Sequence, residues 1–188
     1  MLKFTKMEGI GNDYIYIDGI HQDVPMNPHF ITKISDRHFG IGSDGVIVIQ
    51  ESEICDFKMR MFNLDGSEGK MCGNGIRCFA KFVYDHQLTK KTYLEIETLG
   101  GIKKVWLIID NNKVQYVRVN MGQPILKSKE IPCLFDKEEM INEPIEVDGQ
   151  VYYLTSLSMG NPHTVIYMNH LDFNIQELGI KFEKHILF

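Results

Sequence analysis

Cys72 has the sequence surroundings of a reactive thiol. It lies in the turn Met71-Cys72-Gly73-Asn74-Gly75, and the apolar residues after the turn recur at i, i+3, i+4 and i+7 from Ile76 to Val83, which is helical spacing. The first amides of a helix have no partner within it and carry the positive end of its dipole, so a thiolate or a bound carboxylate there is stabilised. The missing side chains of the two glycines would let a ligand approach those amides closely.

A buried structural cysteine beside an ordinary turn is the alternative explanation, and for a lone cysteine it would be the favourite. The residues before the turn favour a site instead. Residues 57–62 alternate apolar and basic side chains, as a half-buried strand does, and they lead into Asn63 and the polar segment Asp65-Gly66-Ser67-Glu68. The order of strand, polar loop, cysteine turn and helix points polar side chains into the space in front of the helix.

Two further polar residues lie in predicted loops. Asn12 belongs to the glycine-rich loop Glu8-Gly9-Ile10-Gly11-Asn12-Asp13, where a turn residue that caps its own backbone is about an even alternative. His163 ends the segment Ser158-Met159-Gly160-Asn161-Pro162-His163, which is predicted to be a loop because the Asn-Pro step excludes regular helix. Taken alone, a hydrogen-bonded loop histidine is preferred to a catalytic one. Both residues gain weight only in combination with the cysteine turn.

The composition is that of a globular protein with neither a nucleic-acid nor a membrane partner. The chain has 188 residues, of which 44% are hydrophobic and 24% charged, and its net charge is −5, so it lacks the basic surface that nucleic acids select. No apolar run reaches membrane-spanning length, and the first residues lack the long apolar core of a signal peptide. A cytoplasmic location is the default expectation.

The cysteines and glycines argue against disulfide, metal and nucleotide sites. Four cysteines, at positions 55, 72, 78 and 133, are too sparse for a disulfide framework and form no C-x-x-C metal pair. The six steps from residue 72 to 78 put these two cysteines about 120° apart on a helix, which argues against a redox pair. Gly40-x-Gly42-x-x-Gly45 has the spacing of a dinucleotide fingerprint, but it would follow a helix and precede a strand, the reverse of the order that motif needs.

The pattern of elements indicates a mixed α/β fold of the α+β type. Asp110-Asn111-Asn112 is a plausible hairpin turn, so antiparallel pairing is expected. A more polar stretch follows this region, and we place a domain boundary near residue 119, giving domains 1–119 and 120–188. Apolar runs predict strands at 14–17, 46–49, 57–62, 94–98, 105–109, 114–119, 145–147, 151–157 and 164–168, and helical spacing predicts helices at 30–38, 76–87 and 171–179.

Five motifs stand in order along the chain. They are Gly11-Asn12-Asp13-Tyr14, Asp36-Arg37-His38-Phe39-Gly40-Ile41-Gly42, Asn63-x-Asp65-Gly66-Ser67-Glu68, Met71-Cys72-Gly73-Asn74-Gly75-x-Arg77-Cys78 and Met159-Gly160-Asn161-Pro162-His163. Each motif is modest alone, but together they closely resemble diaminopimelate epimerase. The resemblance implies two similar α/β domains, each a curved, mostly antiparallel sheet wrapped around a central helix, with the second domain incomplete here.

The same resemblance implies an activity. It is the cofactor-independent and metal-independent epimerisation of LL-diaminopimelate to the meso form, in lysine and peptidoglycan precursor biosynthesis. The partner implied is a small-molecule amino-acid substrate, and a homodimer stays open. Matched motif by motif, Cys72 would be one of two catalytic acid/base cysteines and His163 would assist at the reacting centre. The substrate would be held by Asn12, Asn63, Asn161 and the amides of Gly73 and Asn74.

One feature of the family pattern is absent from these residues. The second catalytic cysteine belongs to a Cys-Gly-(Thr/Ser)-Gly motif, which the sequence does not contain, and Cys133 has neither a glycine turn nor a helix start after it. The chain is therefore expected to be truncated or partly recorded. Two alternatives remain: another isomerase of the same superfamily, such as a proline racemase or a phenazine-biosynthesis isomerase, or an inactive half that binds ligand without turnover.

Overall fold

The computed structural model describes residues 1–170 and 172–188, and it divides into two compact units, Met1–Met121 and Gly122–Phe188. The division between the units follows Met121, so the boundary predicted after residue 119 is two residues too early and lies near the end of the last strand of the first unit. No helix within the described ranges is long and apolar enough to cross a membrane.

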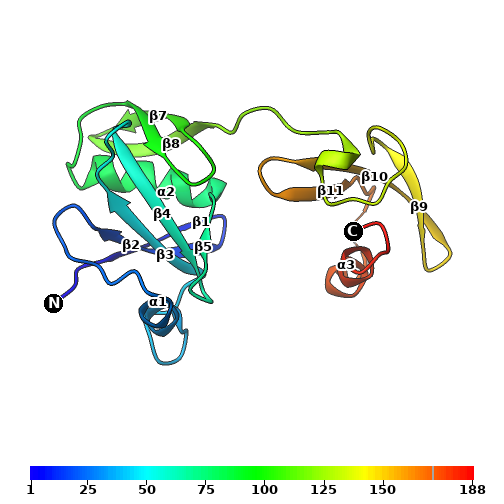
Figure 1. Ribbon diagram of the computed structural model, residues 1–188, viewed down its shortest axis with the longest axis horizontal. Coiled ribbons are helices and arrows are strands. Elements are labelled where there is room, and N and C mark those ends of the chain that lie inside the picture. Colours follow the sequence, from blue (N-terminus) through cyan, green and yellow to red (C-terminus); the bar gives the residue numbers. More distant parts are fainter. Residues whose placement is uncertain (171) are drawn as a thin grey trace. The chain divides into compact units, whose positions relative to one another are not determined.

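The first unit is built on an eight-stranded sheet (Figure 1). Along the sheet the strand order is β1-β2-β3-β4-β6-β7-β8, with β5 paired to β4. Only the β2–β3 and β4–β6 pairs are parallel, so the sheet is mostly antiparallel as predicted. The strands are β1 (Thr5–Gly9), β2 (Asn12–Asp18), β3 (Gly45–Gln50), β4 (Phe57–Asn63), β5 (Glu68–Gly69), β6 (Tyr93–Glu97), β7 (Lys103–Asp110) and β8 (Lys113–Asn120).

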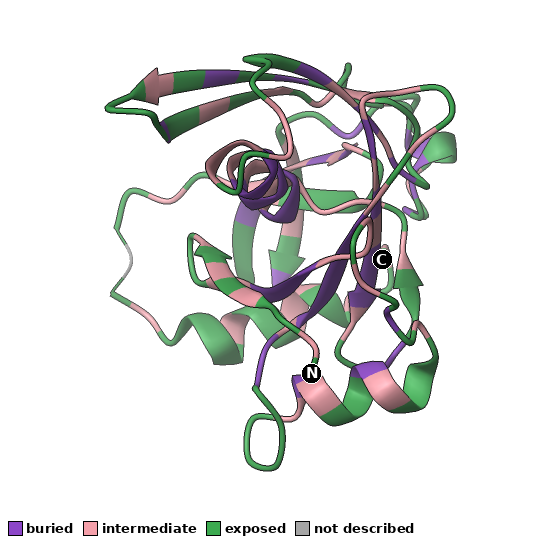
Figure 2. Ribbon diagram, turned by 90° about the vertical axis from the view of Figure 1, so that its left-hand side faces the viewer, coloured by how far each residue is buried: buried purple, intermediate pink, exposed green. Residues whose placement is uncertain are grey.

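Helix α2 (Gly73–Asp85) is the element around which this sheet curves (Figure 1). Its apolar stripe includes Ile76, Phe79 and Val83, all with no exposed surface, and it packs against inward-facing residues such as Ile47 and Leu94. The purple of α2 and the central strands in Figure 2 marks this core. Burial of several large apolar side chains, each stabilising by about 1.5–3 kcal/mol, fixes the helix and therefore the position of its first turn.

Helix α1 (Pro28–Ser35) covers the opposite face of the sheet. Asn27 caps its start by accepting a hydrogen bond from the Phe30 amide at 2.9 Å. The buried Ile31 packs against residues of β2 and β3. Both faces of these two strands are covered, which explains why residues 46–49 form a continuous apolar run.

The second unit has a three-stranded antiparallel sheet, in the order β11-β10-β9. A separate core that includes Met140 and Leu154 lies on this sheet, and Phe182 packs edge-on against Tyr152 with ring centres 5.1 Å apart. The elements are a short 3-10 turn (Ser128–Glu130), β9 (Glu143–Val147), β10 (Gln150–Ser158), β11 (Pro162–Ile166) and α3 (Ile175–Glu183).

Several predicted boundaries are wrong. The predicted 8–13 loop is a hairpin in which only Ile10 and Gly11 turn, both with positive φ, while Asn12 already pairs with Gly9. Pro162 and His163 are not loop residues, because they begin β11 at the edge of its sheet, where a missing amide hydrogen is tolerated. The helix predicted at 171–179 is α3, four residues later; Leu171 lies outside the described residues.

Candidate active site

Cys72 is the N-cap residue of α2, as the sequence predicts. Its Sγ accepts a hydrogen bond from the Gly75 amide at 3.2 Å, and its thiol donates to Oδ1 of Asn12 at 3.2 Å. The residue is half-buried. A cysteine therefore occupies the capping position that Ser, Thr, Asp or Asn usually takes, and its sulfur faces both a helix amide and a neutral side-chain amide.

Gly75 lies close against the buried core at the start of α2. A Cβ added there would lie 2.7 Å from Cδ1 of Ile47 and 3.5 Å from Sγ of Cys72. A side chain at this position would push on the buried core, whereas its distance to the sulfur is that of an ordinary van der Waals contact. Gly73 is open by comparison, since an added Cβ would meet its first neighbour, Cε of Met121, at 3.4 Å.

Asn12 connects the thiol to a network of charged residues. Its Nδ2 donates to Oδ2 of Asp44 at 2.7 Å, and Oδ1 of Asp44 accepts from Arg37 at 2.9 Å. Arg37 also binds Asp13, at 2.7 Å and 3.3 Å, and Lys6 lies 3.0 Å from the same carboxylate. These contacts, led by the hydrogen bond from Arg37, lower the pKa of Asp13 to about 2.

Asn63 and Asn74 both lie in the first unit, and local hydrogen bonds hold their side chains. Nδ2 of Asn63 donates to Oγ of Ser67 at 3.0 Å. Oδ1 of Asn74 accepts from Arg77 at 2.6 Å, and Arg77 also donates to the Gly73 carbonyl at 3.1 Å. The amides of Gly73 and Asn74 belong to the first helical turn, whose amides have no intrahelical acceptor.

Asn161 and His163 lie in the second unit. Asn161 precedes β11 and His163 is its second residue, with Nε2 of His163 3.1 Å from Oδ1 of Asn161. The structure therefore brings together two groups of the predicted residues. Cys72, Asn12 and the helix amides form one group, and Asn161 and His163 form the other.

Tyr14, Arg37 and Asp44 stand beside the thiol or its partner, and sequence reasoning gave them no role. Tyr14 is 5% exposed, and burial, followed by the neighbouring Cys72, raises its pKa to about 12. All three lie in or beside the glycine-rich motifs at residues 11–14 and 36–42. A charged or phenolic side chain in such a loop is the sequence feature that could have drawn attention to them. Their convergence depends on strand pairing, because Asn12 and Asp44 are 32 residues apart.

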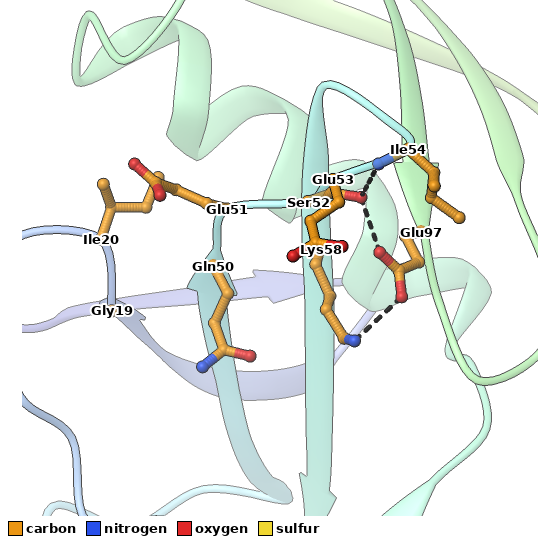
Figure 3. A pocket seen from close by; sticks show the side chains of 9 residues that line it. All are labelled: Gly19, Ile20, Gln50, Glu51, Ser52, Glu53, Ile54, Lys58 and Glu97. Atoms are coloured by element: carbon orange, nitrogen blue, oxygen red, sulfur yellow. Dashed lines mark hydrogen bonds and ion pairs between the residues drawn. The ribbon is translucent and has the colours of Figure 1, made fainter.

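A cleft of about 470 Å³ lies at the other end of β3 and β4 (Figure 3). β3 begins at Gly45, beside Asn63, and ends at Gln50, which lines the cleft; five residue steps of about 3.3 Å separate the two ends by roughly 17 Å. Two of its charged groups pair with each other, since Glu97 lies 2.9 Å from Lys58, and Glu97 also accepts from Ser52 at 2.6 Å. The described residues also hold no group of three or more His, Cys, Asp or Glu placed to bind a metal ion.

Sequence comparison assigns the family. The profile described as diaminopimelate epimerase matches residues 4–127. The chain belongs to the diaminopimelate epimerase family. Proteins named diaminopimelate epimerase from Methanococcus maripaludis strain DSM 14266 and Acetivibrio thermocellus are 54% and 50% identical to it, over 98% and 100% of the chain. In each case the match spans 67% of the relative's length.

Solved structures confirm the epimerase fold. A hydroxyproline epimerase from Agrobacterium vitis, solved with bound trans-4-hydroxy-L-proline, matches with a TM-score of 0.63 at 12% identity. A probable proline racemase from Agrobacterium radiobacter K84 matches with a TM-score of 0.65 at 10% identity. Both matches cover 95% of this chain and 53% of the other, so the chain spans about half the length of these proteins.

Proposed function

We propose that the protein inverts the α-carbon of diaminopimelate, LL to meso, without a cofactor, and that Cys72 is one of two acid/base thiols. Family membership supports the substrate. The observation that carries the mechanism is the position of Cys72, whose sulfur caps α2 and is bonded to both the Gly75 amide and Asn12. This reaction would serve lysine and peptidoglycan precursor biosynthesis, in the cytoplasm.

The proposed chemistry is a proton exchange between two faces of one carbon. A thiolate takes the α-proton and becomes a thiol, and the bonding electron pair stays on carbon. A second thiol on the opposite face then returns a proton and becomes a thiolate, so the product has inverted configuration and no other bond changes. Thiols suit both steps when their surroundings set the protonation.

The proposed binding groups are neutral amides and helix-terminal amides. The amides of Gly73 and Asn74, at the positive end of α2, would stabilise the substrate carboxylate as charge develops on the reacting centre. The side chains of Asn12, Asn63 and Asn161 would hydrogen-bond its ammonium and carboxylate groups at little desolvation cost, and His163 would assist at the reacting carbon. A homodimer remains a proposal that light scattering would test.

The activity test uses a fusion of residues 1–188 to the remaining third of the Methanococcus maripaludis relative. We expect the fusion to convert LL- to meso-diaminopimelate, because it would supply the second thiol that the resemblance to the family implies. The 188-residue chain alone should show negligible conversion, since no opposing acid stands in a matching motif. Robust conversion by the chain alone would refute the two-thiol mechanism.

A substrate panel tests the identity of the amino acid. The solved relatives with proline or hydroxyproline in their titles share 10% to 12% identity with this chain, which supports a common fold only. We expect the fusion to act on diaminopimelate and not on proline or 4-hydroxyproline. Inversion of either imino acid, with none of diaminopimelate, would replace the proposal with a proline racemase type of activity.

A further inference from the structure

The side-chain amide of Asn12 lies between the carboxylate of Asp44, which only accepts hydrogen bonds, and the sulfur of Cys72, which can donate or accept one. An ionised carboxylate such as that of Asp44 accepts only, so the amide of Asn12 must turn its NH2 toward it, and Nδ2 lies 2.7 Å from Oδ2. The amide oxygen then faces the other way, 3.2 Å from the sulfur of Cys72. An amide oxygen accepts only, so the sulfur must be the donor in this contact, which requires a protonated thiol.

The orientation of the Asp44 side chain is itself fixed, because both of its carboxylate oxygens accept hydrogen bonds. Oδ1 accepts from the Arg37 guanidinium at 2.9 Å, and Oδ2 accepts from the backbone amide of Asp13 at 3.1 Å in addition to Asn12. Charge-assisted bonds of this kind are stronger than neutral ones. A flip of the Asn12 amide would face two oxygens toward each other, so the carboxylate opposes it.

We propose that Asp44 is a positioning residue that fixes the amide orientation of Asn12 and thereby keeps Cys72 protonated as a hydrogen-bond donor before substrate binds. The Gly75 amide acts in the opposite direction, because it donates to the sulfur and favours the thiolate. If substrate groups took over the hydrogen bonds of Asn12, the sulfur would keep the hydrogen bond from the Gly75 amide, which favours the thiolate. This role rests on the proposed function of Cys72 as an acid/base residue, but it makes a statement about the thiol that can be tested without turnover.

Three further titratable groups near Cys72 are uncharged at neutral pH. Tyr14 and Tyr16 lie on β2, and the pKa of both phenols is raised above the usual value, chiefly by burial and to a smaller extent by the neighbouring Cys72. Cys78 lies further along α2, and burial likewise raises the pKa of its thiol. Asp44 and its partner Arg37 are charged and are linked to the sulfur through Asn12. Arg77 is charged too, and it donates to the Gly73 carbonyl in the first turn of α2 at 3.1 Å.

The experiment measures alkylation of Cys72 by iodoacetamide in the 188-residue chain, with peptide mass spectrometry to separate it from Cys55. Asp44→Ala removes the acceptor that orients Asn12, and we expect Cys72 to react about three- to tenfold faster at pH 7.5, the value of one hydrogen bond. At pH 10.5, where thiols are deprotonated, the variant and the parent should react at the same rate. A variant that is faster by the same factor at both pH values has only opened access, and that result would overturn the proposal.

Two further variants separate orientation from charge. Asp13→Ala is the matched control, since it removes the other carboxylate bound to Arg37 and leaves the Asn12–Asp44 contact in place, so Cys72 should react as in the parent. Asn12→Ala removes the amide oxygen, so it should also accelerate alkylation about three- to tenfold at pH 7.5 alone. It keeps the test decisive if Asp44→Ala fails to fold.

The double variant Asn12→Ala/Asp44→Ala completes a double-mutant cycle with the two single variants. If Asp44 acts through Asn12, then Asp44→Ala has no further effect on Cys72 once residue 12 is alanine. The same acceleration in both backgrounds would mean a direct charge effect and would overturn the proposal. Since alkylation requires no epimerisation, loss of the proposed activity in the fusion and loss of this coupling are separate results.

Discussion

The two cysteines of α2 lie six residues apart and have opposite surroundings. Cys72 caps the helix, is half-buried and touches a polar network through Asn12. Cys78 is 8% exposed and donates to the Glu8 carbonyl at 3.3 Å, and burial raises the pKa of its thiol. Position along one helix therefore separates a thiol at the polar start of the helix from a thiol that belongs to the core.

The residues around each cysteine follow the same division. The hydroxyl of Tyr16 donates to the Gly75 carbonyl at 3.0 Å and ties the first turn of α2 to the core. The start of the helix is held in addition by Asn12, Asp44 and Arg37, which are polar and reach the solvent. The body of α2 is held by apolar burial, whereas its start depends on hydrogen bonds and charge.

The largest expected effect is on activity. In the fusion described above, Cys72→Ala should abolish inversion, because removing an acid/base group costs about 10²–10⁴ in rate. Cys78→Ala should retain it, since that thiol is part of the apolar core and donates to the Glu8 backbone carbonyl. Conversion of LL- to meso-diaminopimelate measures both. Equal loss of activity in the two variants, with both folded, would remove the distinction between the thiols.

Sequence periodicity predicted the elements that position Cys72. The apolar stripe from Ile76 to Val83 predicted α2, and the alternation at 57–62 predicted β4. The Asp110-Asn111-Asn112 turn was also predicted, and both asparagines have positive φ in a hairpin between β7 and β8. These patterns are local, so a sequence window contains them.

The contacts of the candidate site could not be predicted in the same way. Asn12 meets Cys72 over 60 residues and Asp44 over 32 residues, and both contacts depend on how β2 pairs with β3 and how α2 packs on the sheet. The two-residue strand β5 has no periodicity to detect. Pro162 and His163 begin a strand because β10 pairs with them, which the Asn-Pro step conceals.

A smaller effect is expected from a methyl group placed at the start of α2. Gly75→Ala adds helix propensity of about 1 kcal/mol, but its Cβ overlaps Cδ1 of the buried Ile47 at 2.7 Å and approaches the sulfur of Cys72. Overpacking costs about 1–3 kcal/mol. Gly179→Ala in α3 is the matched control, because among the described residues no atom outside the adjacent backbone of the same helix lies within 4 Å of its added Cβ, and it should gain about 0.5–1 kcal/mol.

Native-state hydrogen exchange of the amides in each helix measures these two changes separately, which is necessary because the helices belong to different units. We expect protection of α2 to fall relative to the gain seen in α3 by about 1–3 kcal/mol. Equal gains in protection from Gly75→Ala and Gly179→Ala would show that the first turn of α2 has room for a side chain. The core around Ile47 would then accommodate the added methyl group without a loss of stability.

The smallest effect concerns the pH dependence of the polar end of the site. The pKa of Asp13 is lowered from 3.8 to about 2, chiefly by its hydrogen bond to Arg37. A lowered carboxyl pKa contributes stability that is present above the unfolded value and is lost as pH falls toward the folded value. Because Arg37 is 52% exposed, we expect Asp13→Asn to reduce the free energy of unfolding by about 1–2 kcal/mol at pH 6.

The difference in the free energy of unfolding between the parent and the Asp13→Asn variant should shrink as pH falls below about 4 and approach zero near pH 2. Urea titrations of the parent and variant between pH 6 and pH 3 measure it, and a difference that is constant over this range would mean that the Asp13–Arg37 charge pair does not stabilise the folded protein.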